Sequence, residues 1–141
     1  MIRGVAFICV GNSARSQIAE AIAKKIAKEK GLNIKVYSAG IQPSGFINSM
    51  AIRILEEDNI PIEDQYSKGM DQIPINDIDL VIFVCEESYC PSTDEVFKGK
   101  KILHWYLPDP FSYEQFYFIR ESLKSRINDL FERLDAKDIQ I

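Results

Sequence analysis

The chain has 141 residues, of which 46% are hydrophobic and 27% are charged, with a formal net charge of -4. These proportions are typical of one compact domain with an adequate core, which we expect to span residues 1–141. The acidic balance argues against a nucleic-acid partner and against an anionic membrane surface, because both need clustered Lys and Arg. No apolar run approaches the roughly 20 residues that span a bilayer and no targeting segment is evident, so we expect a cytoplasmic protein.

Short apolar runs alternate along the chain with segments of helical periodicity. The runs are rich in Val, Ile and Phe and too continuous for half-exposed antiparallel strands, so they predict buried parallel strands. The predicted strands are residues 5–10, 34–40, 79–85 and 100–105, and the predicted helices are residues 16–30, 47–59 and 112–135. Gly31 is a plausible C-terminal cap of the first helix. This order predicts an α/β three-layer sandwich, with right-handed crossovers and helices on both faces of the sheet.

A cysteine and an arginine flank the turn between the first predicted strand and the first predicted helix. Cys9 ends the strand, and Arg15 stands six positions later, close to the helix start. In a parallel sheet of this kind, ligands bind beyond the carboxyl ends of the strands. A five-residue loop at this place can curl around a tetrahedral oxyanion, with its N–H groups pointing inward and the positive end of the helix behind it.

The loop residues have the properties that such an anion site requires. The oxyanion-binding amides are predicted to be those of Val10, Gly11, Asn12, Ser13, Ala14 and Arg15. Gly11 and Asn12 are residue types that tolerate the left-handed backbone of such a loop. The planar guanidinium of Arg15 can hold two oxygens of the anion. These groups favour the thiolate of Cys9, to which Ser13 or Ser16 can add a hydroxyl hydrogen bond.

Three cysteines are an odd number in a chain that is large enough to fold without disulfides. The thiols of Cys9, Cys85 and Cys90 are therefore free, redox-active or metal-bound. A zinc site built from them and His104 is a weak alternative, because C-x4-C is not a characteristic ligand spacing. We predict no bound metal and no cofactor.

The segment CVGNSARSQIAEAI resembles the signature of the low-molecular-weight protein tyrosine phosphatase superfamily. Its NSxRSQxAE pattern is closer to the thioredoxin-coupled arsenate reductase branch than to the true phosphatases. The segments VYSAG, DLVIFVC, CP, HW and DP follow in the order and rough spacing of the reductases, so the resemblance covers nearly the whole chain. It implies a four-stranded parallel sheet of order 2-1-3-4, flanked by helices, of the low-molecular-weight phosphatase type.

The resemblance also implies a relay of three thiols. Cys9 would attack arsenate, Cys85 would attack Cys9 and release arsenite, and Cys90 would resolve the Cys9–Cys85 disulfide for a thioredoxin-like reductant. The reductases usually have six residues between the last two cysteines, whereas CEESYC has four. In regular helix two such residues would lie about 9 Å apart at Cα, beyond the ~7 Å limit for a disulfide, so this segment must bend or unwind to become oxidised.

The resemblance assigns roles to residues outside the loop. Asp109 of the DP pair would be the general acid that protonates the leaving oxygen. Phe111 and Tyr113 stand where phosphatases often place aromatic residues beside a phosphotyrosine ring, although both could belong to the core side of the last helix. His104 and Trp105 follow the reductase pattern, and we assign them no catalytic role.

Some reductases of this family bind potassium behind the loop through an Asn, a Glu, a Ser and a Thr-Ser-Asp segment. Asn12, Glu20 and Ser38 match the first three, and Lys68 stands where the Asp would be. The Lys68 ammonium is thus predicted to replace the ion. Four residues are predicted to support the loop, namely Asn12, Ser16, Ser38 and Lys68.

Two alternatives to arsenate reduction use the same loop, because phosphate and arsenate have the same charge and nearly the same shape. The first is hydrolysis of phosphotyrosine or aryl phosphates through a phosphocysteine at Cys9, with Cys85 and Cys90 structural or protective. The second is a phosphocysteine carrier module of the sugar phosphotransferase type, which the chain resembles less because such modules lack the equivalents of Arg15 and Asp109.

Overall fold

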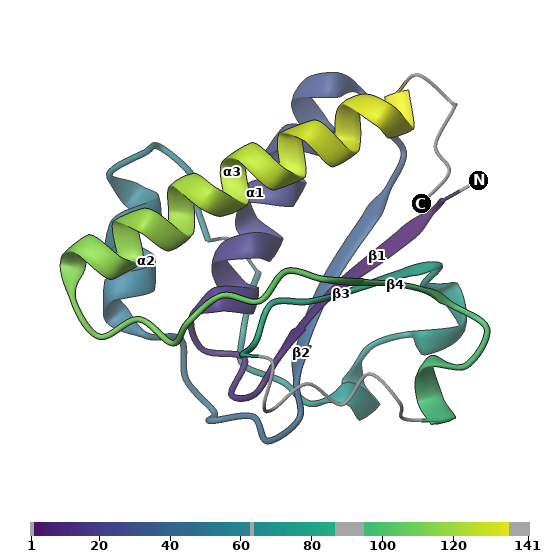
Figure 1. Ribbon diagram of the computed structural model, residues 1–141, viewed down its shortest axis with the longest axis horizontal. Coiled ribbons are helices and arrows are strands. Elements are labelled where there is room, and N and C mark those ends of the chain that lie inside the picture. Colours follow the sequence, from purple (N-terminus) through teal and green to yellow (C-terminus); the bar gives the residue numbers. More distant parts are fainter. Residues whose placement is uncertain (1, 63, 87–94, 136–141) are drawn as a thin grey trace.

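The computed structural model describes residues 2–62, 64–86 and 95–135 (Figure 1). The strands are β1 (Gly4–Cys9), β2 (Lys35–Gly40), β3 (Leu80–Phe83) and β4 (Lys101–His104). The α-helices are α1 (Arg15–Lys30), α2 (Ser49–Glu56) and α3 (Tyr113–Asp135), and the 3-10 helices are η1 (Met70–Gln72), η2 (Ile75–Asp77) and η4 (Glu95–Phe97). The alternation of strands and helices agrees with the sequence-based prediction.

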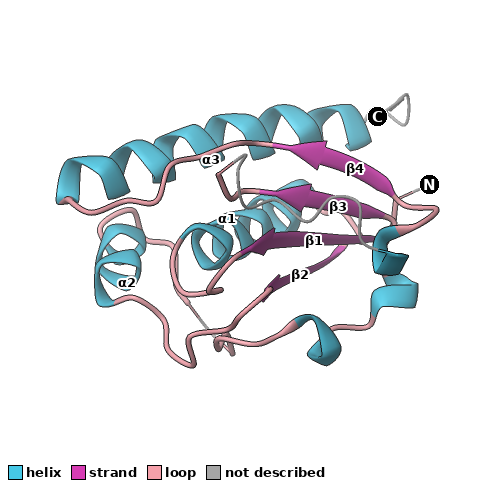
Figure 2. Ribbon diagram, turned by 60° about the horizontal axis from the view of Figure 1, so that its bottom comes forward, coloured by secondary structure: helices cyan, strands magenta, loops and turns pink. Residues whose placement is uncertain are grey.

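The four strands form one parallel sheet in the order β2-β1-β3-β4, which confirms the predicted topology (Figure 2). Every residue of β1 is buried, as expected of a central strand covered on both sides. The register pairs Cys9 with Gly40 of β2, and Ile8 with Phe83 of β3. The ends of β1, β2 and β3 therefore meet at one edge of the sheet.

Helix α1 packs on the sheet through small and branched side chains. Ile18 and Ile22 are buried one turn apart, and Ala19 and Ala23 bring the helix backbone close to its neighbours. The helix ends at Gly31, which has a left-handed φ of 67° and donates its N–H to the carbonyls of the last turn. Gly31 is the C-cap that the sequence predicts, because this backbone conformation is strained for any residue with a Cβ.

Helix α3 lies beside α1 and buries Leu123, Ile127 and Phe131, which are spaced four residues apart along one face (Figure 1). The guanidinium of Arg126 in this helix lies 5.9 Å from the centre of the Trp105 ring, which in turn lies 6.2 Å from that of Phe7. This stack connects α3 to the central strand. Within the described residues, no helix combines the length and the apolar character that are needed to cross a membrane.

The predicted element boundaries differ from the observed ones mainly at α2 and β3. Helix α2 begins after Asn48, because the Asn48 side chain accepts the N–H of Met50 at 2.8 Å and so caps the helix. It ends at Glu56, and Asn59 then adopts a left-handed φ of 55°. Strand β3 ends at Phe83, two residues before the predicted end at position 85.

Ion pairs at the end of α2 attach this helix to α3. Arg120 of α3 is buried and donates from Nη1 to the carbonyl of Ile54 at 2.9 Å. Lys124 Nζ lies 2.6 Å from Oδ2 of Asp58, and this hydrogen bond lowers the pKa of Asp58 below its ordinary 3.8. The position of α2, whose N-terminus contacts the loop after β1, thus depends partly on charge.

We expect Asp58→Asn to lower the free energy of unfolding by about 0.5 kcal/mol at neutral pH, a value discounted for the exposure of this pair. A carboxylate with a depressed pKa in the folded state stabilises the fold above its unfolded pKa, and this stabilisation is lost as the pH falls through the folded pKa. Urea unfolding at pH 7 and at about pH 3 measures the effect. An equal loss at both pH values would contradict the assignment, and Asp129→Asn, in an exposed ion pair within α3, is the control.

Candidate active site

The thiol of Cys9 lies at the end of β1, almost completely buried at 2% exposure. Its sulfur is 2.8 Å from the hydroxyl oxygen of Ser16, in the first turn of α1. Of the two serines predicted to contact the sulfur, Ser16 has a hydrogen bond to it. A hydroxyl that donates to this sulfur would stabilise the thiolate, as would the positive end of α1.

Every carbonyl group from Cys9 to Ala14 accepts a hydrogen bond from a donor outside this loop. Each hydrogen bond is given as donor and then acceptor: Ile41 N to Cys9 O, Gln42 N to Val10 O, Ser44 N to Gly11 O, Gln17 Nε2 to Asn12 O, Asn48 N to Ser13 O and Ile18 N to Ala14 O. No peptide bond in the described residues is cis. In a trans peptide the N–H points away from the preceding C=O, so we expect the amides of residues 10–15 to be left for a ligand in the loop. This hydrogen-bonding pattern leaves the predicted inward-facing nest possible, and the nest stays a prediction.

The loop turns at Asn12, which has a left-handed φ of 50°. Asn tolerates this conformation better than most residues with a side chain, so the prediction for Asn12 is confirmed. Gly11 does not have a positive φ, so of the two residues whose types tolerate a left-handed backbone only Asn12 adopts it. One left-handed residue is enough to turn the chain here, since Gly11 is held through its carbonyl by Ser44 N and Ser67 Oγ.

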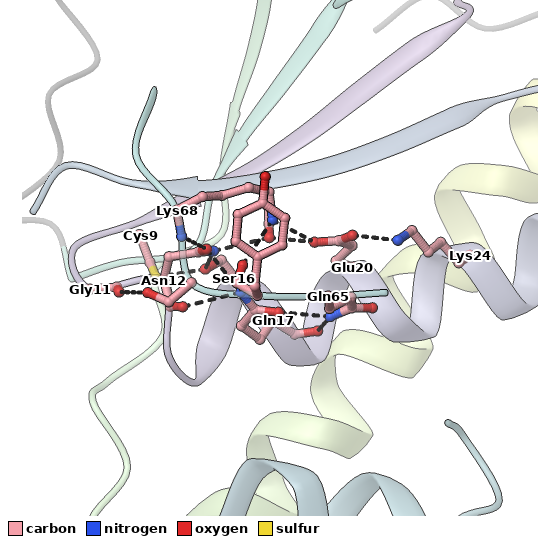
Figure 3. A network of polar contacts seen from close by, with 12 residues as sticks. Cys9, Gly11, Asn12, Ser16, Gln17, Glu20, Lys24, Gln65 and Lys68 are labelled. Atoms are coloured by element: carbon pink, nitrogen blue, oxygen red, sulfur yellow. Dashed lines mark hydrogen bonds and ion pairs between the residues drawn. The ribbon is translucent and has the colours of Figure 1, made fainter. Parts of the chain in front are cut away.

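The Asn12 side chain is fully buried at the centre of a polar network (Figure 3). Its Nδ2 donates to Ser16 Oγ at 2.8 Å and to Ser38 Oγ at 3.0 Å. Its Oδ1 accepts from Gln17 Nε2 at 2.8 Å and from the backbone N–H of Lys68 at 2.9 Å. All four hydrogen-bonding positions of this amide are therefore used, which fixes the orientation of the loop.

Lys68 lies behind the loop with its ammonium in the protein interior (Figure 3). Its Nζ donates to the carbonyl of Tyr66 at 3.1 Å and lies 3.6 Å from Oε1 of the buried Glu20. Burial lowers the pKa of Lys68, and the charge of Glu20 partly offsets this effect. Glu20 also accepts from Ser38 Oγ at 2.5 Å, so Lys68 is next to the residues that match the potassium ligands of the family.

The sequence interpretation assigned no role to Gln17 or Gln65, which extend the network. Gln17 Nε2 donates to the carbonyl of Tyr66 as well as to Asn12, and its Oε1 accepts from Gln65 Nε2 at 2.7 Å. Gln17 thus attaches the segment around residue 66 to the loop. The only sequence signal for Gln17 is its place in the NSxRSQxAE pattern.

Gly40 is a third residue whose importance the sequence interpretation did not recognise. A Cβ at this position would lie 2.7 Å from the carbonyl oxygen of Val10 and 2.9 Å from the N–H nitrogen of Asn12. Contacts this short with backbone atoms do not occur in folded proteins. The end of β2 therefore approaches the loop closely only because residue 40 has no side chain.

Arg15 and Asp109 meet at the rim of the loop. The guanidinium of Arg15 is buried, donates from Nη1 to the carbonyl of Leu107 at 2.8 Å and places Nη2 3.7 Å from Oδ1 of Asp109. The Asp109 side chain is 50% exposed. Its backbone N–H donates to Oε1 of Glu86 at 3.2 Å. The predicted acid is thus close to the predicted anion-binding arginine, although they are 94 positions apart in sequence.

Cys85 is completely buried and follows the last residues of β3. Because Ile8 pairs with Phe83, Cys9 lies one residue beyond this pair at the end of β1, and Cys85 lies two residues beyond it, after the end of β3. Their backbones thus approach the same edge of the sheet.

Cys90 is outside the described residues, so the predicted relay through it stays a prediction. Among the described residues, no group of three or more His, Cys, Asp and Glu side chains could hold a metal ion.

The aromatic residues near the acid differ in their environments. Phe111 is 84% exposed, so it does not belong to the core side of the last helix. The hydroxyl of Tyr113 donates to Glu57 at 2.6 Å, a bond that lowers the pKa of Glu57 and raises that of Tyr113. The His104 ring stacks on Phe83 at 5.4 Å between centres, which is a packing role.

Comparisons with known proteins agree with this geometry. The family described as low molecular weight phosphotyrosine protein phosphatase matches residues 4–140, and the chain belongs to this family. It is 41% identical over 125 residues to an arsenate reductase of Bacillus cereus, covering 86% of this chain and 88% of that protein. The predicted superfamily, and its arsenate reductase branch, are confirmed, and the relatives in both branches are enzymes.

Two solved structures show the same fold. The structure named "An arsenate reductase in the phosphate binding state" has a TM-score of 0.80 and 32% identity, covering 98% of this chain and all of that one (100%). A thioredoxin-dependent arsenate reductase of Corynebacterium glutamicum has a TM-score of 0.75 and 30% identity, covering 96% of this chain and 63% of that one. This chain therefore has the same α/β fold as both of these proteins.

We expect Gly40→Ala to destabilise the protein and to displace the loop. The added methyl group contacts backbone atoms, which cannot rotate away, so we expect a loss of about 1–3 kcal/mol in the free energy of unfolding. Chemical denaturation gives the stability, and affinity for inorganic phosphate reports the loop. The control is Ser125→Ala, at an exposed position of α3. Gly99→Ala is unsuitable, because Gly99 has a positive φ and any side chain there strains the backbone. Unchanged stability and phosphate affinity in Gly40→Ala would contradict the close approach.

We predict that Lys68 makes the protein independent of potassium. Replacing potassium by sodium at constant ionic strength should leave the melting temperature and the activity unchanged, and a strong potassium requirement would contradict this. Lys68→Met should lower the free energy of unfolding by about 1 kcal/mol, because Glu20 loses the nearby ammonium of Lys68 but keeps its ion pair with Lys24 at 2.5 Å. Lys28→Met, at an exposed position of α1, is the matched control.

Proposed function

We propose that this protein is an arsenate reductase that uses Cys9 as nucleophile, Cys85 as the second thiol and a thioredoxin-like protein as reductant. The observation that carries the proposal is the position of Cys85, at the end of the strand beside the one that ends in Cys9. Hydrolysis of a phosphate ester needs one thiol, whereas reduction of arsenate needs two. The similarity to proteins named arsenate reductase supports the same function.

The loop provides the binding site for the arsenate oxyanion in this proposal. The amides of residues 10–15 would face the anion and complement its negative charge, and α1 adds the positive end of its dipole. Arg15 contributes a fixed positive charge at the rim. Arsenate bound in this way would have its arsenic atom above the sulfur of Cys9.

In the first step, the Cys9 thiolate attacks arsenic and an oxygen leaves. Asp109 donates the proton that this oxygen needs to depart as water, which makes it the general acid. The product is a thiol–arsenate ester, in which arsenic is still pentavalent. The contact between Arg15 and Asp109 supports this assignment, because it puts the acid beside the group that holds the anion.

In the second step, the Cys85 thiolate attacks the sulfur of Cys9. A Cys9–Cys85 disulfide forms, the sulfur–arsenic bond breaks, and its electron pair stays on arsenic, which leaves as trivalent arsenite. Two thiols lose two electrons and arsenic gains them. Cys90 would then attack Cys85 and free Cys9, and the thioredoxin-like dithiol would reduce the resulting Cys85–Cys90 disulfide. The thioredoxin-dependent relative supports this partner.

Hydrolysis of aryl phosphates is the second candidate function. It is favoured by the exposed Phe111, two residues from Asp109, which offers a surface for an aromatic leaving group. The phosphocysteine formed at Cys9 would be hydrolysed by water, and the same acid would serve. A carrier module that retains its phosphocysteine is disfavoured by the presence of Arg15 and Asp109 together.

Cys85→Ser separates the two activities. We expect it to abolish arsenate-dependent oxidation of reduced thioredoxin in steady state, because no thiol remains to attack Cys9. Hydrolysis of p-nitrophenyl phosphate should stay within about twofold of the parent, since its chemistry uses only the loop and the acid. Loss of phosphoenzyme turnover in this variant would show instead that Cys85 has a structural role.

Two controls accompany this experiment. Cys9→Ser should abolish both activities, because Ser is a far weaker nucleophile at neutral pH. Both variants should retain the melting temperature of the parent within a few degrees. Reduction of arsenate by Cys85→Ser at the parental rate would overturn the proposed relay.

A further inference from the structure

The backbone of Asp109 is held by a side chain from another part of the sheet. Its N–H donates to Oε1 of Glu86 at 3.2 Å. Glu86 follows directly after Cys85, beyond the end of β3, and its side chain is half-buried. The chain segment that provides the second thiol therefore also contacts the predicted acid.

The segment around Asp109 is held at alternate residues. The carbonyl of Leu107 accepts from Arg15 at 2.8 Å, and the N–H of Phe111 donates to Gln115 Oε1 at 2.5 Å. Leu107 is buried and attached to the loop, whereas Phe111 is attached only to the start of α3. Between these two points, Pro108 and the buried Pro110 restrict the local conformation, and the hydrogen bond to Glu86 ties the backbone N–H of Asp109 to the segment after β3.

The side chain of Asp109 has little else to orient it. It is half exposed, and its contact with Arg15 is 3.7 Å, which is longer than a charge-assisted hydrogen bond. The direction of its carboxyl group therefore follows the direction of its backbone. A proton donor must lie within hydrogen-bond reach of the leaving oxygen, so a backbone shift of about 1 Å would remove much of its effect.

We propose that Glu86 is a positioning residue for the general acid. By accepting the N–H of Asp109, it holds the acid beside Arg15 and above the loop. The inference rests on the proposed function in one respect, namely the role of Asp109 as proton donor. Glu86 itself does not touch the substrate.

The dependence of the rate on the leaving group tests this role. p-Nitrophenolate leaves readily without a proton, whereas the phenolate of phenyl phosphate leaves poorly unless it is protonated. Removing the acceptor in Glu86→Ala should therefore lower kcat/KM for phenyl phosphate by about tenfold and for p-nitrophenyl phosphate by less than about threefold. A change in stability alone would lower both rates equally.

Two variants serve as matched controls. Glu86→Gln keeps an oxygen that can accept the same N–H, so both of its rates should stay within about twofold of the parent. Glu56→Ala removes a charge from an exposed position of α2, and it should leave the ratio of the two rates unchanged. Equal losses in Glu86→Gln and Glu86→Ala would overturn positioning through this hydrogen bond.

Asp109→Asn distinguishes failure of the inference from failure of the proposed function. This variant should reproduce the loss on phenyl phosphate in a larger form. If it has no effect on either substrate, Asp109 is not the acid and the inference falls with that assignment. If it has the expected effect while Glu86→Ala behaves like Glu56→Ala, the acid role stands and the positioning role is wrong.

Amide hydrogen exchange tests the hydrogen bond between Asp109 and Glu86 without measuring a catalytic rate. In the parent, the N–H of Asp109 donates to Glu86, so we expect it to exchange more slowly than an N–H of similar exposure that has no hydrogen bond. Glu86→Ala should raise its exchange rate by about tenfold or more, while the N–H of Phe111, bonded to Gln115, should change little. An unchanged exchange rate at Asp109 would overturn the proposal.

Discussion

The buried side chain of Asn12 is the constraint on which the loop depends. A chain that directs all its carbonyl groups outward and all its amides inward concentrates partial positive charge, and it needs external partners to keep that shape. Asn12 provides them, because a primary amide has two donors and an acceptor with two lone pairs, and all are used by α1, by β2 and by residue 68. The same residue takes the left-handed conformation that turns the chain.

Two buried or partly buried cations lie on opposite sides of this loop. Arg15 is at the rim, where its charge meets Asp109 and would meet a bound oxyanion. Lys68 is behind the loop, where its charge is balanced by Glu20. The guanidinium of Arg15 lies at the rim, whereas the Lys68 ammonium donates to the carbonyl of Tyr66 and pairs with the buried Glu20, which commits it to the structure. In the proposed function the loop binds an anion on the side of Arg15, and the ion pair of Lys68 and Glu20 braces it on the other.

The sequence by itself determined the features that depend on neighbouring residues. The apolar runs fixed the parallel strands, since buried strands need continuous Val, Ile and Phe. The spacing of Cys9 and Arg15 across a strand–helix turn predicted an oxyanion site, and Gly31 marked the end of the first helix. The motif order along the chain also predicted the family and the strand order. Each of these signals comes from neighbouring residues or from the order of short motifs along the chain.

The tertiary structure decided what depends on residues that are far apart in the chain. It showed that Gly40 must lack a side chain, because the end of β2 lies against the loop. It also showed that Glu86 contacts Asp109, a pair separated by 23 positions and brought together by the parallel arrangement of β3 and β4. Gly11, chosen from its residue type, did not need the left-handed backbone, because Asn12 alone turns the chain. Sequence patterns report preferences of single residues and segments, whereas such contacts exist only once the strands are side by side and their ends share one edge of the sheet.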